Sequence, residues 1–152
     1  MKISGSVVIV THNSSNTIAD CLNTLAQRDE DRWFLTIVVD NCSTDATVEI
    51  IEEHYPWVRL IKSPDNGGFG AGNNQGIAIS KGDWIFFLNP DAMISPTILE
   101  SLSGRLKLDK SIGIAAPLVL DASGRKTVSH FPFLTLWTSS WIALGMQKVM
   151  PI

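Results

Sequence analysis

Three short polar motifs, each placed just after an apolar run, carry the residue types with which this chain could do chemistry. They are Thr11-His12-Asn13, Asp40-Asn41 and Asn89-Pro90-Asp91. Asp91 offers a hard carboxylate on a backbone that Pro90 stiffens, and such a group suits a divalent metal ion that already carries phosphate oxygens. Asp40 could accept a hydrogen bond from the imide N–H of uracil or thymine. The flat ring of His12 could stack on the same base.

Each of these residues also has a purely structural interpretation. Asn-Pro-Asp is a common turn sequence that caps a following helix. His12 could be a loop histidine that only hydrogen-bonds backbone. Asp45 follows Ser43 and Thr44 in a cluster typical of helix N-caps, so capping and bracing of a binding pocket are both open for it. Asp40 favours function more strongly, because a carboxylate directly after a buried strand is costly without a purpose.

The elements predicted around these motifs place them at one edge of a sheet. Residues 84–88 form an unbroken apolar run, which predicts a strand buried on both faces. Apolar runs also predict strands over 7–10, 34–39, 58–61 and 112–120, and a hairpin turn at 121–124 that pairs 126–129 back. Helices are predicted over about 15–28, after Asp45, over 73–80 and from Ser95-Pro96 onward. This alternation predicts an α/β fold with a mostly parallel central sheet, whose ligands bind beyond the carboxyl ends of the strands.

Residues 63–72 are predicted to form a glycine-rich loop, with four glycines among positions 67–72. Glycines permit close approach of backbone to a ligand. The spacing does not match the GxGxxG dinucleotide fingerprint, and the lysine of a P-loop is missing. A dinucleotide-binding oxidoreductase domain is therefore the weakest of the functions considered. Phe69, inside this loop, is expected to be packed rather than functional.

The bulk properties exclude several classes of protein. The chain has 152 residues, a net charge of −3 and no basic patch, so nucleic acid binding has no support. Its two cysteines, Cys21 and Cys42, match no zinc spacing and fit a reducing compartment. No signal-peptide pattern and no apolar run of about 18 residues is present. We therefore expect a cytoplasmic protein.

Four ordered blocks resemble the family 2 inverting glycosyltransferases, and most of all the rhamnosyltransferase-like branch that builds cell-surface polysaccharide. The blocks are VVIVTHNS (7–14), VVDNCSTD (38–45), NGGFGAGNNQG (66–76) and FLNPDA (87–92). The resemblance implies a three-layer α/β/α fold of the nucleotide-diphospho-sugar transferase type. It implies transfer of a sugar from a donor such as dTDP-rhamnose or a UDP-sugar to a cell-surface polysaccharide or lipid-linked acceptor.

The resemblance also implies a role for each matching residue. Thr11 and Asp40 would contact the base, His12 stands where many relatives have a stacking tyrosine, and Asp45 would brace the pocket. Residues 66–73 would cover the donor. The implied substrate-binding set is Thr11, His12, Asn13, Asp40, Asn41, Asp45, Asn66, Gly68, Asn73 and Asn89. Asp91 would be the last acid of the family's metal motif, binding Mg²⁺ or Mn²⁺ together with the diphosphate, because Asn89 replaces the motif's first acid.

The second half of a complete relative is not matched. In relatives, a later segment supplies an Asp or Glu general base, whereas this chain has no acidic residue after Asp121. We therefore expect a C-terminally truncated enzyme that binds its donor but transfers poorly. The alternative is a non-catalytic remnant or nucleotide-sugar-binding module that needs a partner chain. Asp109 and Asp121 are expected to be structural.

Two parts are predicted along the chain. Residues 1–130 would form the nucleotide-sugar-binding domain, and residues 131–152 an apolar segment of an incomplete acceptor half. Leu134, Trp137, Trp141 and Leu144 recur in that segment at helical spacing. We expect it to dock on protein, either a partner chain or a second copy. Peripheral contact with the inner face of the plasma membrane is the alternative.

Overall fold

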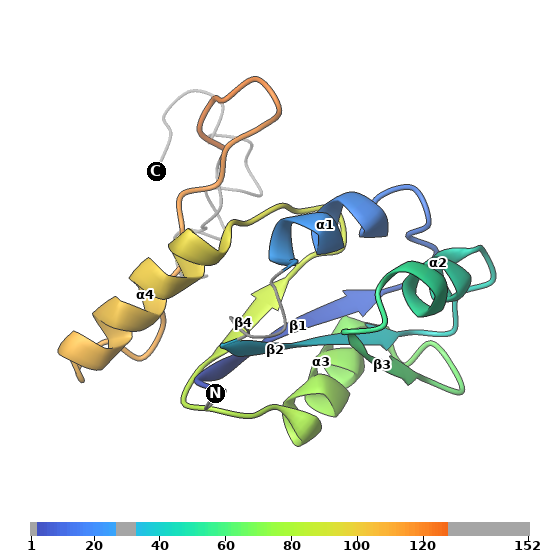
Figure 1. Ribbon diagram of the computed structural model, residues 1–152, viewed down its shortest axis with the longest axis horizontal. Helices are drawn as coiled ribbons and strands as arrows, with labels where there is room; N and C mark the ends of the chain where they lie inside the picture. The colour runs from blue at the N-terminus through green and yellow to red at the C-terminus, as the bar shows by residue number, and fades with distance from the viewer. Residues whose placement is uncertain (1–2, 27–32, 128–152) are drawn as a thin grey trace, which may run out of the picture. The chain divides into compact units, whose positions relative to one another are not determined.

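The computed structural model describes residues 3–26 and 33–127 (Figure 1). The chain divides into two compact units, Met1–Ile114 and Ala115–Ile152. All strands and helices named below belong to the first unit. The predicted apolar segment 131–152 lies outside the described residues. Within the described residues, no helix has the length and apolar character needed to cross a membrane.

The central sheet has four parallel strands in the order β3-β2-β1-β4. Their bounds are β1 (Gly5–Thr11), β2 (Phe34–Asp40), β3 (Arg59–Lys62) and β4 (Ile85–Leu88). In register, Thr11 lies opposite Asp40, and Ile9 lies opposite Leu88. The predicted parallel sheet is therefore confirmed, and the polar motifs follow strand ends at one common edge.

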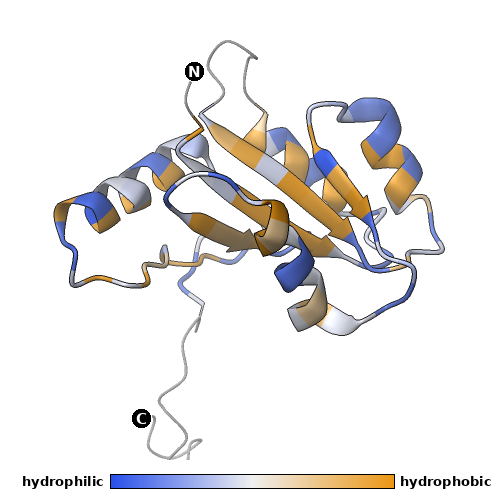
Figure 2. Ribbon diagram, turned by 90° about the horizontal axis from the view of Figure 1, so that it is seen from below, coloured by the Kyte–Doolittle hydropathy of each residue, from blue (hydrophilic) through white to orange (hydrophobic). Residues whose placement is uncertain are grey.

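Helices cover both faces of the sheet, which gives the predicted three layers (Figure 1). They are α1 (Ile18–Leu25), α2 (Thr47–His54), α3 (Gly68–Ile79) and α4 (Pro96–Leu108). One core joins Val7, Ile9 and Val38 to buried residues of α1, α2 and α4. On the other face, α3 packs against β1 and β2, where Val8, Val10, Ile37 and Val39 form a second cluster. Figure 2 shows the apolar strands between these layers.

The glycine-rich stretch is a helix where the sequence predicted a loop: α3 begins at Gly68 instead of Asn73. A Cβ atom at Gly72 would lie 2.7 Å from Cγ1 of Val10, and one at Gly76 would collide with Val8. These two glycines therefore let the helix lie directly on the sheet. Phe69 is 57% exposed, so the prediction that it is packed was wrong.

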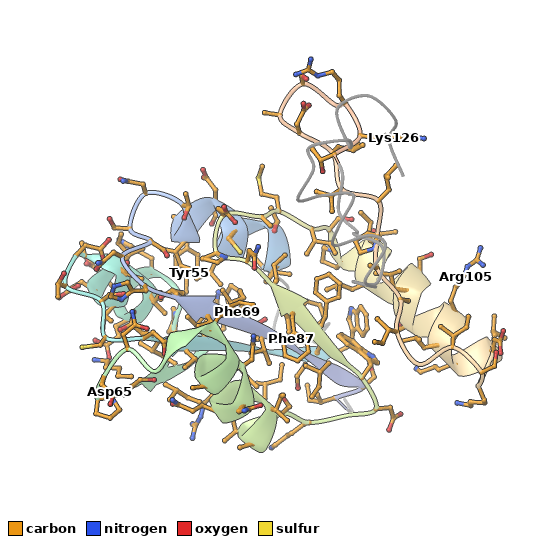
Figure 3. The ribbon with its side chains drawn as sticks, turned by 180° about the vertical axis from the view of Figure 1, so that it is seen from behind. Tyr55, Asp65, Phe69, Phe87, Arg105 and Lys126 are labelled. Atoms are coloured by element: carbon orange, nitrogen blue, oxygen red, sulfur yellow. The ribbon has the colours of Figure 1, made fainter. Side chains whose placement is uncertain are left out.

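Strand β4 is not buried on both faces, which corrects a second prediction. Ile85 and Phe87 are exposed, Phe87 by 48% of its surface. In register they lie opposite Ser6 and Val8, so they share the face on which α3 lies (Figure 3). Among the described residues β4 pairs only with β1, and it therefore forms an edge of the sheet. An apolar run of five residues cannot distinguish such an edge strand from a central one.

Residues 112–119 form no strand, contrary to the prediction. In the second unit, Leu120 and Lys126 make an isolated antiparallel bridge. Asp121 closes the turn between them by accepting hydrogen bonds from Ser123 and Arg125. The predicted hairpin turn at 121–124 is thus confirmed as far as the structure describes it.

Candidate functional site

Asp40 organises the loops at the ends of β1 and β2. Its side chain is 2% exposed, and its carboxylate accepts hydrogen bonds from Thr11 Oγ1 (3.1 Å), from the Ser43 backbone N–H (2.9 Å) and from Ser43 Oγ. Burying a carboxylate is tolerable when several donors satisfy it. Asp40 therefore gives the tip of β2 a fixed shape before any ligand arrives.

The ring of His12 is held in one orientation above this tip. Its Nδ1 lies 2.8 Å from the backbone oxygen of Asn41, and a carbonyl can only accept, so Nδ1 carries the hydrogen. Nε2 lies 3.4 Å from the side-chain amide of Asn13, which can donate to it. His12 therefore does hydrogen-bond backbone, and its side chain remains exposed. An oriented, exposed ring can also stack on a base.

Asn13 and Asp45 tie the β1–α1 loop to the β2–α2 loop. Asn13 has a left-handed backbone (φ 53°), and its Oδ1 accepts from the Thr44 N–H at 2.8 Å. Asp45 accepts from the N–H groups of Ser15 and Thr47, both at 3.0 Å. Burial alone would raise the pKa of Asp45, but the hydrogen bonds from Thr47 and Ser15 outweigh it and lower the pKa well below its usual range. Asp45 therefore accepts from the first N–H group of α2 and also holds the neighbouring loop through Ser15.

The glycine-rich segment is joined to the same tip through Asn41. The Asn41 side chain is buried, and its Nδ2 donates to the backbone oxygen of Gly68 at 3.0 Å. Asn66 Oδ1 in turn accepts from the Gly68 N–H at 3.1 Å. Asn73 lies half-buried farther along α3. The structure thus places Asn41 beneath the segment that was predicted to cover the donor, a placement that its polar residue type did not indicate.

An open pocket of about 430 Å³ lies at the end of β4. Asn89 and Asp91 line it and are exposed. Its full lining is Asn13, Ser14, Asn16, Thr17, Asn89, Pro90 and Asp91. Sequence reasoning missed Ser14, Asn16 and Thr17, because the first helix was predicted from about residue 15 whereas α1 begins at Ile18.

Cys21 lies beneath this pocket. It is buried, and its Sγ–H points at the backbone oxygen of Asn89 at 3.6 Å. Burial, and then the negative charge of Asp91, raise the pKa of the Cys21 thiol to about 12. The thiol is therefore protonated and packed, as expected of a core cysteine.

Asp40 and Asp91 lie at the same edge of the sheet, on either side of β1. Strands β2 and β4 both pair with β1, so their tips are separated by two strand spacings, roughly 10 Å. Asn13 belongs to both regions, because it hydrogen-bonds Thr44 of the β2–α2 loop and lines the pocket at Asp91. The residues predicted from three separate strand ends are therefore brought together.

The residues at the β4 tip fit only a metal ion that arrives with other ligands. Within the described residues, no group of three or more His, Cys, Asp or Glu side chains could hold a metal ion. Asp91 is a single exposed carboxylate in an open polar pocket. Mg²⁺ is commonly held by one or two carboxylates plus substrate phosphates, and this arrangement matches that pattern.

Neither acid late in the described chain is built as a general base. Asp109 accepts from Ser111, and this hydrogen bond lowers its pKa. Asp121 accepts from Ser123 and Arg125, which likewise lower its pKa. A base that works near neutral pH needs a raised carboxyl pKa instead. Both acids therefore serve local turns.

Known proteins are similar to this chain in sequence and in fold. The TarS poly(ribitol-phosphate) beta-N-acetylglucosaminyltransferase of Staphylococcus aureus is 33% identical over 99 residues, which is 62% of this chain and 17% of TarS. The poly(ribitol-phosphate) beta-glucosyltransferase of Bacillus spizizenii is 35% identical over 104 residues, 65% of this chain and 16% of that protein. This chain thus spans about a sixth of the length of these relatives.

Solved structures of glycosyltransferases are also similar to this chain in fold. TarS residues 1–349 in complex with UDP superpose with a TM-score of 0.61 and 30% identity, covering 71% of this chain and 32% of that one. The mannosyltransferase PcManGT of Pyrobaculum calidifontis, solved with GDP-Man and Mn²⁺, has a TM-score of 0.62 over 72% of this chain and 34% of its own. At 20% identity that likeness supports the fold alone.

The profile of the family described as "Glycosyl transferase family 2" matches residues 6–142, which covers all strands and helices of the first unit except Gly5 at the start of β1. The chain therefore belongs to family 2 of the glycosyltransferases.

Proposed function

We propose that this chain binds a nucleotide-diphospho-sugar and forms the donor-binding part of a glycosyltransferase acting on a cell-surface polymer. The observation that carries the proposal is the junction at Asn13, which joins the prebuilt tip of β2 to the open pocket at Asp91. The two polymer-modifying relatives and the binding of UDP by TarS support it.

The base would sit at the tips of β1 and β2. Ionised carboxylate oxygens offer about four acceptor positions, and three donors already use Asp40. Its Oδ2 accepts from Ser43 N–H and keeps one position for the imide N–H of uracil. The His12 ring, oriented by Asn41, would stack on the base. Because thymine presents the same imide, dTDP-rhamnose remains a second donor candidate.

The diphosphate would then lie across the tip of β1 toward Asp91. In that position the donor phosphates and Asp91 would share a divalent cation, either Mg²⁺ or Mn²⁺. Such a cation supplies Lewis-acid stabilisation of the leaving diphosphate. Asn13 and Asn89, which line the pocket, would orient the phosphate oxygens from the pocket side.

Sugar transfer needs a base that deprotonates the acceptor hydroxyl, and the lowered pKa values of Asp109 and Asp121 do not suit that role. We therefore propose that the 152-residue chain binds donor and turns it over slowly without a partner. A pure binding module is the second candidate.

Calorimetry with UDP, dTDP and GDP, each with and without Mn²⁺, tests the proposal. We expect UDP or dTDP to bind and GDP to bind at least tenfold more weakly, because guanine presents a different edge to Asp40. Equal binding of all three nucleotides, or none, would contradict the assigned base pocket. Turnover of a UDP-sugar at ordinary enzymatic rates would refute the slow-transfer part alone.

A further inference from the structure

Asn41 makes hydrogen bonds to three different parts of the site. Its backbone N–H donates to the Thr11 oxygen at 2.8 Å, and its backbone oxygen accepts from His12 Nδ1 at 2.8 Å. Its side-chain Nδ2 donates to the Gly68 oxygen at 3.0 Å. With 2% of its surface exposed, this side chain serves the protein's interior and not the solvent. One residue therefore connects β1, the His12 ring and the first turn of α3.

Residues 66–72, the segment that Asn41 contacts through Gly68, contain four glycines and therefore have a flexible backbone. Gly68 has φ +82°, and Gly67 and Gly70 flank it. Glycine backbones lose the most freedom on ordering, so such a turn needs a fixed point. Gly72 leaves room for the Asn41 side chain, because a Cβ at Gly72 would lie 3.3 Å from Asn41 Nδ2.

Only the nitrogen of the Asn41 side-chain amide is hydrogen-bonded among the described residues. Its Oδ1 is buried and has no hydrogen-bond partner among the described residues. Turning the amide over would place Oδ1 against the Gly68 oxygen, two acceptors face to face, so the donor must point to Gly68. The Asn41 amide is thus held to the segment by the single Nδ2–H···O bond to Gly68.

We propose that Asn41 is a positioning residue, a latch that holds the start of α3 against the tip of β2 so that residues 66–72 close over the donor. The proposal deepens the proposed function and rests on it for the donor. Asn41 itself need not touch the ligand. Breaking the latch leaves Asp40 and its three donors in place and releases only the glycine-rich segment.

The substitution N41D tests the latch with nearly unchanged shape. At about pH 8 the introduced carboxylate would face the Gly68 oxygen as a second acceptor, and the segment would open. At about pH 5 burial and this neighbouring acceptor favour the protonated acid, which can donate and restore the bond. N74D, at an exposed asparagine of the same helix, is the matched control for charge.

The first readout is amide hydrogen exchange over residues 66–72 without ligand, each variant compared with the unchanged chain at the same pH. We expect N41D to exchange about tenfold faster at pH 8 and to approach the unchanged chain at pH 5, as expected for loss of one hydrogen bond. N74D should match the unchanged chain at both. Faster exchange in N41D that is the same at both pH values would overturn the latch and indicate a general structural defect, as would unchanged exchange.

The second readout is UDP affinity, which the latch predicts to fall about tenfold in N41D at pH 8 and to recover at pH 5. Normal affinity in a variant whose segment exchanges faster would overturn the link to the donor. If the unchanged chain binds no nucleotide, the proposed function fails, and the exchange experiment still decides the latch. If N41D does not fold, exchange in the unchanged chain must slow over 66–72 when UDP binds, and constant exchange there would refute the proposal.

Discussion

The tips of β2 and β4 carry one aspartate each, and the two are built in opposite ways. Asp40 is 2% exposed and satisfied by three donors, whereas Asp91 is exposed in an open pocket. Preorganised groups pay their ordering cost during folding, whereas open groups gain their partners on binding. The difference indicates that the base half of the site is ready before binding and that the metal half is completed by the donor.

The largest expected effect is at the prebuilt tip. Asp40→Ala removes the acceptor of Thr11 and Ser43, two groups held beside a buried strand end, and should destabilise the fold by about 3 kcal/mol. UDP binding should be lost with it. Urea denaturation measures the change, and Asp65→Ala, at an exposed acid, serves as the control. Equal stability of the two variants would show that the Asp40 network is not what holds this tip.

The next largest effect is expected where α3 packs closely against the sheet. Gly76→Ala should cost about 1–3 kcal/mol, because the new methyl group collides with Val8. Gly70→Ala in the same helix meets no atom within 4 Å and should instead stabilise by up to about 1 kcal/mol. Thermal unfolding of the two variants gives the comparison. Similar shifts in both would mean that the helix does not need its glycines against the sheet.

The brace at Asp45 should contribute less, and its contribution should depend on pH. Its folded-state pKa is depressed below the usual 3.8, so its stabilisation is full above that value and is lost as the pH falls through the folded-state pKa. Asp45→Asn should lower stability near neutral pH by about 1 kcal/mol. The difference in unfolding free energy between the unchanged chain and Asp45→Asn should become smaller in acid, below about pH 3.8. A gap that widens there would contradict the assigned hydrogen bonds to Ser15 and Thr47.

The smallest perturbation probes the two cysteines, which flank the two tips. Cys42 is exposed next to the β2 tip, whereas Cys21 is buried beneath the β4 pocket with its pKa raised to about 12. Near pH 8, iodoacetamide should modify Cys42 and leave Cys21 untouched until the chain unfolds. Mass spectrometry of the labelled peptides provides the measurement. Rapid labelling of Cys21 would show that the pocket floor opens far more than the packing indicates.

The sequence was sufficient for the parts that depend on buried strands. Residues 7–10 and 34–39 are runs rich in β-branched residues, and both became central strands with their polar ends where expected. Asp40, His12 and Asn13 therefore came together as predicted, because parallel strands end at one edge. The roles of these residues toward a donor remain predictions.

Features set by tertiary contact could not be predicted in the same way. Glycine has low helix propensity, and the close fit of Gly72 and Gly76 against Val10 and Val8 is a tertiary contact that favours the helix over the predicted loop. The exposure of Phe87 depends on β4 lying at the edge of the described sheet, which its apolar run does not reveal. The burial of Asn41 depends on where α3 begins, so it was equally out of reach.

In the proposed complex, one nucleotide diphosphate bridges the tips of β2 and β4. The most direct test is UDP titration of the unchanged chain and of Asp91→Ala, each with and without Mn²⁺. We expect Mn²⁺ to strengthen UDP binding at least tenfold in the unchanged chain and to leave the variant unaffected, with equal metal-free affinity in both. If Mn²⁺ strengthens binding equally in both chains, or if the variant loses metal-free binding, Asp91 and Asp40 do not divide the donor as proposed.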